Sequence, residues 1–192
     1  MLLMLKDKTF LLFLLLIIGV YFFNNSNSNI AVFDRYLIVE EHEYWRVLTH
    51  SFVHVDLKHL LDNLIGIVIF RYLLKETRFI QAVMMAMLFT FITSVFYIYI
   101  NYPPTEGFSS AMYGLIAYYS LQYYFNRKEK FYILIYFSSI FAMSISFIFE
   151  YYHFFNHYGV AHAGHLFSII IGTFTYFSFH QIKKTQLQKE YI

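Results

Sequence analysis

The sequence predicts an all-α membrane protein, a six-transmembrane-helix bundle with both termini in the cytoplasm. Hydrophobic residues make up 59% of the 192 residues and charged residues only 14%, whereas soluble domains carry about 25% charged residues. Apolar runs close to the length of about 20 residues that crosses a bilayer recur along the chain. Lysine and arginine are concentrated in alternate connections between these runs.

The apolar runs define the expected spans of one membrane domain without a separate soluble part. They lie at about residues 9–23, 57–74, 79–100, 109–125, 131–149 and 161–180. Most of the 14 lysines and arginines lie at the amino end, in the second and fourth loops and in the tail, and the third and fifth loops have none. By the positive-inside rule, the first, third and fifth loops therefore face away from the cytoplasm.

The first span follows Lys6 and Lys8 and resembles a signal peptide in its charge and apolar length. The segment NNSNSN follows it in place of a small-residue cleavage site, so we expect it to be retained as an anchor helix.

The long first loop, about residues 24–56, mixes acidic residues with apolar stretches such as YLIVEEHEYWRVL. This mixture favours an amphipathic segment in the headgroup layer, with Trp45 and Arg46 as interfacial anchors. A plain extracellular linker is the alternative. At the end of the third span, we expect Tyr97, Tyr99 and Tyr102 to form part of an interfacial belt of tyrosines.

The second, fourth and sixth spans each carry one polar stripe at helical spacing. Polar groups in hydrocarbon are expensive, so they usually pair with another helix or line a wet cavity. The stripes consist of His59 with Asn63 in the second span, Ser109 with Tyr113 in the fourth, and His165 with Ser168 and Gly172 in the sixth.

The three stripes are expected to lie at one depth. At about 1.5 Å per residue, His59, Ser109 and His165 lie about 24 to 27 Å from the cytoplasmic charge that ends each helix. This layer lies a few ångströms below the outer boundary of a hydrocarbon core of about 30 Å. Gly107, in the turn-forming segment NYPPTEG, permits a close approach to Ser109, where the first helical amides lack partners.

This combination suits acyl transfer. His165, with an ordinary pKa of about 6.5, can take the proton from the Ser109 hydroxyl near neutral pH. His59, Asn63 and the Ser109 amide can donate hydrogen bonds to the oxyanion. No carboxylate lies in the sixth span or beside Ser109, so we expect a Ser/His dyad, and His162 is a less favoured base because Ile169 occupies its i+7 position.

Metal chemistry has weaker support. His50, His54 and His59 could be a metal cluster, but the chain has no cysteine and no H-E-x-x-H motif. We therefore expect neither a metal nor another cofactor. The net charge of +2 is too small to suggest binding of nucleic acid.

Three motifs, EYWRVLTHSFVHVDLKHLLDN, GFSSAMYG and AHAGHLFSIIIG, resemble those of the rhomboid family of intramembrane serine proteases. The resemblance covers residues 9 to 182 and implies cleavage of transmembrane helices near the outer membrane face. It implies a catalytic pair of Ser109 and His165, with Tyr113 stacked on the imidazole. It also implies supporting roles for Trp45, Arg46, His54, His59, Asn63 and Gly107.

Two positions depart from the family pattern, because Ser110 and Ser168 replace glycines. Both residues are small, so the fourth and sixth helices can still approach closely. The predicted protein is a multi-pass protease of the cell membrane whose active site opens to the non-cytoplasmic side and whose partners are transmembrane substrates and lipid. One alternative is a catalytically inactive relative that escorts or retains membrane-protein helices. A small transporter is another, supported only by Asp62.

Overall fold

The computed structural model describes residues 7–26, 30–74, 78–153 and 162–190, and within these residues it is all-helical, as predicted. A long helix lies in each of the six predicted segments, and three short helices lie in the first loop. The long helices are α2 (Lys8–Ser26), α5 (Leu57–Leu73), α6 (Phe79–Tyr99), α7 (Ser109–Arg127), α8 (Lys130–His153) and α9 (His162–Glu190). The short ones are α3 (Arg35–Val39), α4 (Arg46–Thr49) and the 3-10 helix η1 (His50–Phe52).

Two of the described helices are long and apolar enough to cross a membrane by length and composition: α6 and the Lys130–Ile148 part of α8. The apolar part of α2, Lys8–Asn24, is shorter. Helix α5 has only 17 residues and carries charges such as Lys58 and Asp62, while α7 contains several serines and tyrosines. These polar groups lower the hydropathy of the same helices that carry the predicted site.

Local sequence signals set the helix boundaries. The Asp34 carboxylate accepts a hydrogen bond from Leu37 N at 3.2 Å and caps α3. Asp56 caps α5 in the same way, through His59 N at 2.7 Å. Because a side-chain oxygen satisfies an otherwise unpaired amide, each aspartate fixes the start of its helix. Lys128 ends α7 in a left-handed conformation.

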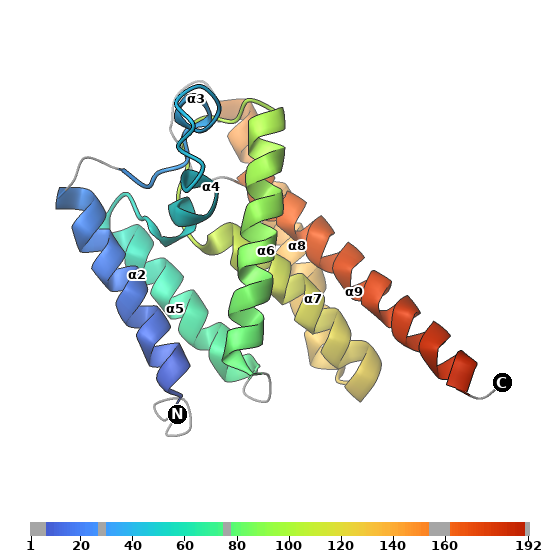
Figure 1. Ribbon diagram of the computed structural model, residues 1–192. Helices are drawn as coiled ribbons and strands as arrows, with labels where there is room; N and C mark the ends of the chain where they lie inside the picture. The colour runs from blue at the N-terminus through green and yellow to red at the C-terminus, as the bar shows by residue number, and fades with distance from the viewer. Residues whose placement is uncertain (1–6, 27–29, 75–77, 154–161, 191–192) are drawn as a thin grey trace.

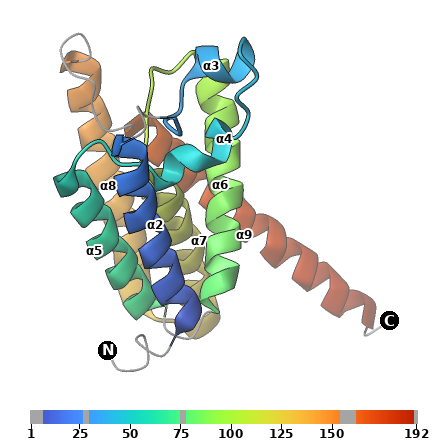
Figure 2. The same cartoon turned by 60° about the vertical axis from the view of Figure 1, so that its left-hand side comes forward.

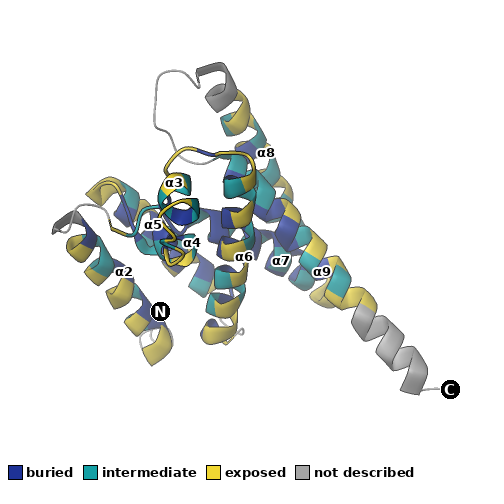
Figure 3. Ribbon diagram, turned by 45° about the horizontal axis from the view of Figure 1, so that its top comes forward, coloured by how far each residue is buried: buried dark blue, intermediate teal, exposed yellow. Residues whose placement is uncertain are grey.

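Helix α7 lies in the middle of the bundle, between α6, α8 and α9, while α2 and α5 run side by side at one edge (Figures 1 and 2). Its buried surface is prominent in Figure 3, and the exposed surface of α2 and α8 faces outward. Helices α7 and α9 approach closely where Gly172 faces the Gly114 carbonyl: a Cβ on Gly172 would lie 2.1 Å from that oxygen. Small residues at this crossing therefore let the helix that carries Ser109 pack directly on the helix that carries His165.

The first loop is folded against the carboxyl-terminal part of α6 and is not a plain linker. Phe33 forms an antiparallel bridge with Thr105, with N–O distances of 3.0 and 3.2 Å. His50 Nε2 lies 2.9 Å from Ser94 Oγ, and that hydroxyl donates to Val47 O at 2.8 Å. Because the Ser94 proton goes to Val47, His50 Nε2 is the donor in the first contact. These bonds attach the loop to α6 and to the loop before α7.

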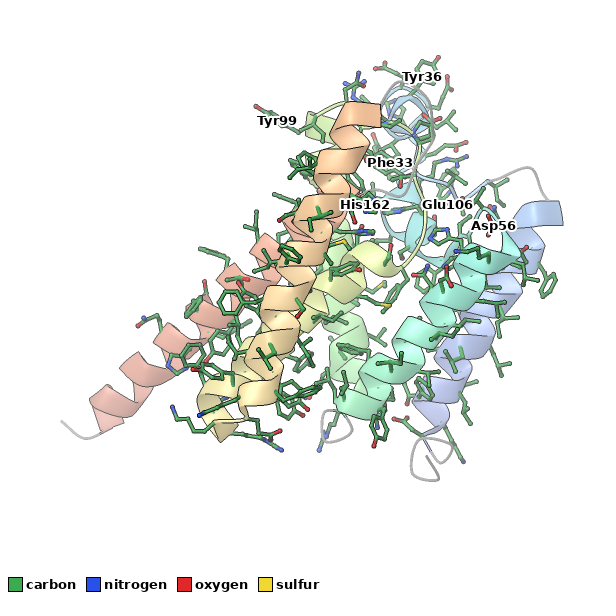
Figure 4. The ribbon with its side chains drawn as sticks, turned by 180° about the vertical axis from the view of Figure 1, so that it is seen from behind. Phe33, Tyr36, Asp56, Tyr99, Glu106 and His162 are labelled. Atoms are coloured by element: carbon green, nitrogen blue, oxygen red, sulfur yellow. The ribbon has the colours of Figure 1, made fainter. Side chains whose placement is uncertain are left out.

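Two expectations for aromatic and cationic anchors need correction. Arg46 is buried, because its side chain pairs with Glu43 and donates to Val32 O at 2.8 Å, so the prediction of an interfacial anchor was wrong. Trp45, by contrast, is exposed. Of the predicted tyrosine belt, only Tyr99 is exposed and points away from the bundle (Figure 4). Tyr97 and Tyr102 are buried in a small cluster with Phe33 and Ile38.

Candidate active site

The loop before α7 delivers Ser109 to the start of that helix. Gly107 adopts a φ of 104°, which side-chain-bearing residues rarely adopt, and its N–H donates to His50 O at 2.9 Å. The turn at Gly107 and its bond to η1 together fix where α7 begins. No side chain caps this helix, so the amides of its first turn can donate to a ligand.

Ser109 and His165 are brought together from α7 and α9. Ser109 Oγ lies 2.7 Å from His165 Nε2, the distance of a hydrogen bond. Ser109 is half-buried and His165 is buried. The other ring nitrogen of His165, Nδ1, is buried without a hydrogen-bond partner among the described residues. When the hydroxyl donates to Nε2, Nδ1 carries the ring proton, and no described carboxylate accepts it.

Two aromatic rings flank the His165 imidazole. The Tyr113 ring lies one turn after Ser109, with its centroid 4.8 Å from that of His165 and an interplanar angle of 36°. The His162 ring lies edge-on to His165 at 5.6 Å. His162 is therefore next to the pair, but the hydrogen bond from Ser109 goes to His165, as the i+7 argument favoured.

His59 and Asn63 lie against Gly107, just before the serine. A Cβ on Gly107 would lie 2.8 and 2.9 Å from two atoms of the His59 ring and 3.9 Å from Asn63 Nδ2. Asn63 Nδ2 donates to His59 O at 3.0 Å, which uses one of its two N–H groups. The second N–H and the His59 ring are hydrogen-bond donors near the amino end of α7.

His54 supports His59 from the end of the first loop. Its ring is fully buried and lies 5.0 Å from the His59 ring, nearly perpendicular to it. Burial, together with repulsion from His59, lowers the pKa of His54 to about 4. His54 is therefore neutral at pH 7 and packs against His59 without placing a positive charge there.

Glu106 directly precedes Gly107 and is not among the predicted site residues. Glu106 lies close to Asp56 at the amino end of α5 (Figure 4), and its Oε1 is buried without a hydrogen-bond partner among the described residues. Burial, with a smaller contribution from Asp56, raises the pKa of Glu106 to about 7. The available signal in the sequence was an acidic residue directly before the GFSSAMYG motif.

The two serines that replace glycines both have partners on α6. Ser168 Oγ lies 2.8 Å from Thr93 Oγ1, and Ser110 Oγ lies 3.4 Å from the Tyr97 hydroxyl. The departures from the family pattern are thus accommodated without leaving either hydroxyl alone in the core. Among the residues that the structure describes, no three histidine or acidic side chains are grouped to hold a metal ion.

The sequence was compared with protein-family models and with curated proteins. The model of the rhomboid domain matches residues 41–182, a range that contains the three motifs and both residues of the Ser109–His165 pair. No curated protein matched the chain. The match covers well over half of the chain, and the chain belongs to the rhomboid family.

Proposed function

We propose that the protein is an intramembrane serine protease that cleaves transmembrane helices through a dyad of Ser109 and His165. The single observation that carries this proposal is the 2.7 Å hydrogen bond between Ser109 Oγ and His165 Nε2. Family membership supports it, because rhomboid proteins are membrane-integral, act on transmembrane substrates and are generally serine proteases.

In the proposed reaction, Ser109 Oγ attacks the carbonyl carbon of the scissile bond while His165 Nε2 accepts the hydroxyl proton. Negative charge develops on the carbonyl oxygen, to which His59, Asn63 and the Ser109 amide donate hydrogen bonds. His165 then gives its proton to the leaving amine, and an acyl group stays on Ser109. A water molecule, activated by His165, releases the second product and restores the hydroxyl.

The geometry around the pair supports these roles. The Tyr113 ring restricts rotation of the imidazole, and the bond from Gly107 to His50 fixes the turn that carries the serine. In this proposal, catalysis by the dyad comes from positioning of the pair and from oxyanion binding.

The proposal places the chain in the cell membrane with six spans and cytoplasmic termini. The distribution of lysine and arginine supports this orientation. The site then opens to the non-cytoplasmic side, because Ser109 and His165 lie at the ends of α7 and α9 that adjoin the folded first loop. Substrates are membrane proteins with a helix that can enter the site from the bilayer.

A serine-reactive fluorophosphonate probe tests the proposal directly. The purified wild-type protein in detergent should be labelled, and the Ser109→Ala and His165→Ala variants should not be labelled while keeping the wild-type melting temperature. Both variants should also fail to cleave a reporter transmembrane helix. Wild-type protein that binds the reporter without being labelled or cleaving it would contradict the protease assignment and indicate the inactive, helix-escorting alternative.

A further inference from the structure

The Tyr97 side chain lies between the two helices that carry the candidate catalytic pair. Tyr97 belongs to α6 and is fully buried. Its hydroxyl lies 3.4 Å from Ser110 Oγ, beside the nucleophile in sequence. The same hydroxyl lies directly over Gly164, beside the base, because a Cβ built there would be 1.6 Å from it. One phenol therefore contacts the neighbours of both Ser109 and His165.

Tyr97 is held in place by residues that belong to neither of those helices. Its ring stacks on Tyr102 with centroids 4.6 Å apart and packs edge-on against Phe33 at 5.4 Å. The Tyr102 N–H donates to Tyr97 O at 2.9 Å. Phe33 is in turn bonded to Thr105 through both backbone groups. The position of the phenol is thus determined by α6 and by the first and third loops.

The contact with Gly164 gives the phenol a steric role. A separation of 3.4 Å is long for a bond between two hydroxyls, so the contact with Ser110 is weak. The approach to Gly164 is much tighter, because a Cβ would also lie 2.4 Å from the ring carbon Cζ. Protein interiors are close-packed, so a rigid ring at this point sets the spacing of the backbones on either side.

We propose that Tyr97 is a positioning residue that sets the separation of Ser109 Oγ and His165 Nε2, acting as a spacer between the amino ends of α7 and α9. The inference rests on the proposed protease function and names a residue that touches neither the substrate nor the reacting atoms. Loss of the spacer lets the two helix ends move together or rotate. The hydrogen bond between the pair then loses its length and direction.

Steady-state kinetics in proteoliposomes test the proposal with three variants. Tyr97→Leu removes the ring and should lower kcat about 100-fold, the effect of a displacement of about 1 Å, while KM stays within about threefold of wild type. Tyr97→Phe keeps the ring and should keep kcat within about threefold. Tyr99→Leu, on the same helix but 87% exposed, is the matched control and should behave as wild type.

Three results would each overturn the spacer role. They are a change in KM without a change in kcat, an unchanged kcat in Tyr97→Leu, and an equal decrease of kcat in Tyr97→Leu and Tyr97→Phe. The last result would place the effect in the hydroxyl. Melting temperatures measured on the same preparations identify any variant that is simply unfolded.

A rescue experiment decides the question if Tyr97→Leu does not fold. Gly164→Ala places a methyl group where the Tyr97 phenol lies and should abolish cleavage. Adding Tyr97→Leu to Gly164→Ala vacates that space and should raise the rate at least about tenfold over Gly164→Ala alone, because directly contacting residues couple. A double variant no faster than Gly164→Ala would contradict direct contact as the cause.

The probe labelling described above separates the two proposals. If wild-type protein is not labelled by the fluorophosphonate, the protease assignment fails. If wild-type protein is labelled and Tyr97→Leu is labelled at the same rate, only the spacer role of Tyr97 fails.

Discussion

Substituting Gly172 by alanine should move Ser109 and His165 apart, although the substitution lies seven residues from His165. Gly172 lies seven residues after His165, on the same face of α9, and a Cβ there would meet Gly114 O at 2.1 Å and Gly114 C at 2.9 Å. Ordinary contact begins at 3.4 Å. The obstacle is backbone, which has no rotamer to change, so α9 must move away from α7 by about 1 Å.

That displacement is large beside the 2.7 Å that joins Ser109 Oγ to His165 Nε2. A separation increased by about 1 Å is beyond a normal hydrogen bond, and the expected loss in cleavage rate is about 100-fold. We also expect overpacking to destabilise the fold by about 1–3 kcal/mol. The assay is the initial rate of cleavage of a fluorescent transmembrane reporter in proteoliposomes, with the melting temperature measured on the same samples.

Gly19→Ala is the matched control, because a Cβ on Gly19 has nothing within 4 Å. It makes the same chemical change in a membrane helix without a steric conflict, so rate and stability should match wild type. A Gly172→Ala variant that cleaved within about twofold of the wild-type rate would refute the reasoning. It would mean that α7 and α9 do not need this approach to align the pair.

Three further outcomes are expected. The pKa of Glu106 is raised from 4.5 to about 7 in the folded protein, so protonation of this carboxyl stabilises the fold. This stabilisation is fully present below pH 4.5 and is lost as pH rises through 7. Glu106→Gln should therefore raise the free energy of unfolding by about 1 kcal/mol at pH 8, after allowance for solvent screening, and leave it unchanged at pH 4, as melting temperatures at the two pH values would show. Ser168→Ala should lower the free energy of unfolding by about 1–2 kcal/mol, because the Thr93 hydroxyl loses its hydrogen-bond partner Ser168. In thermal unfolding, the double variant with Thr93→Val should be only slightly less stable than Ser168→Ala alone. Ser110→Ala should cleave the reporter within about threefold of wild type, because its hydroxyl contact is weak; a rate as low as that of Ser109→Ala would contradict this.

The helical periodicity of the sequence predicted which residues share a face of one helix. The i and i+4 spacing of His59 with Asn63 and of Ser109 with Tyr113 placed these pairs on common faces, and counting residues from the charges that end each helix predicts one shared depth. The 2.7 Å contact depends on more than depth, because it also needs the rotation of α7 against α9. The small residues Gly114 and Gly172 set that rotation, and of these only Gly172 was visible as part of a stripe.

Residue type gave wrong predictions of burial where segments distant in sequence cover the residue. Arg46 and Tyr97 have side chains that commonly lie at a membrane interface, but the first loop folds over α6 and buries both. Arg46 is buried because Glu43 and the Val32 carbonyl satisfy its charge and donors. Glu43 lies three residues before Arg46, a helical spacing, but Val32 lies fourteen residues before it, and no helical pattern reveals that contact before the loop's path is known.

The two serines that replace family glycines show that hydrogen bonding between helices can still be recognised in the sequence. An added hydroxyl in a membrane core needs a partner, and here Ser168 and Ser110 find theirs in Thr93 and Tyr97. These partners are four residues apart on α6, so they face the same side of that helix. A pair of hydroxyl residues at that spacing in an otherwise apolar span is therefore a signal that neighbouring helices contribute hydroxyls of their own. Applied to the third predicted span, this reasoning assigns Tyr97 to the helix interface and Tyr99, two residues later on the opposite face, to the exposed surface.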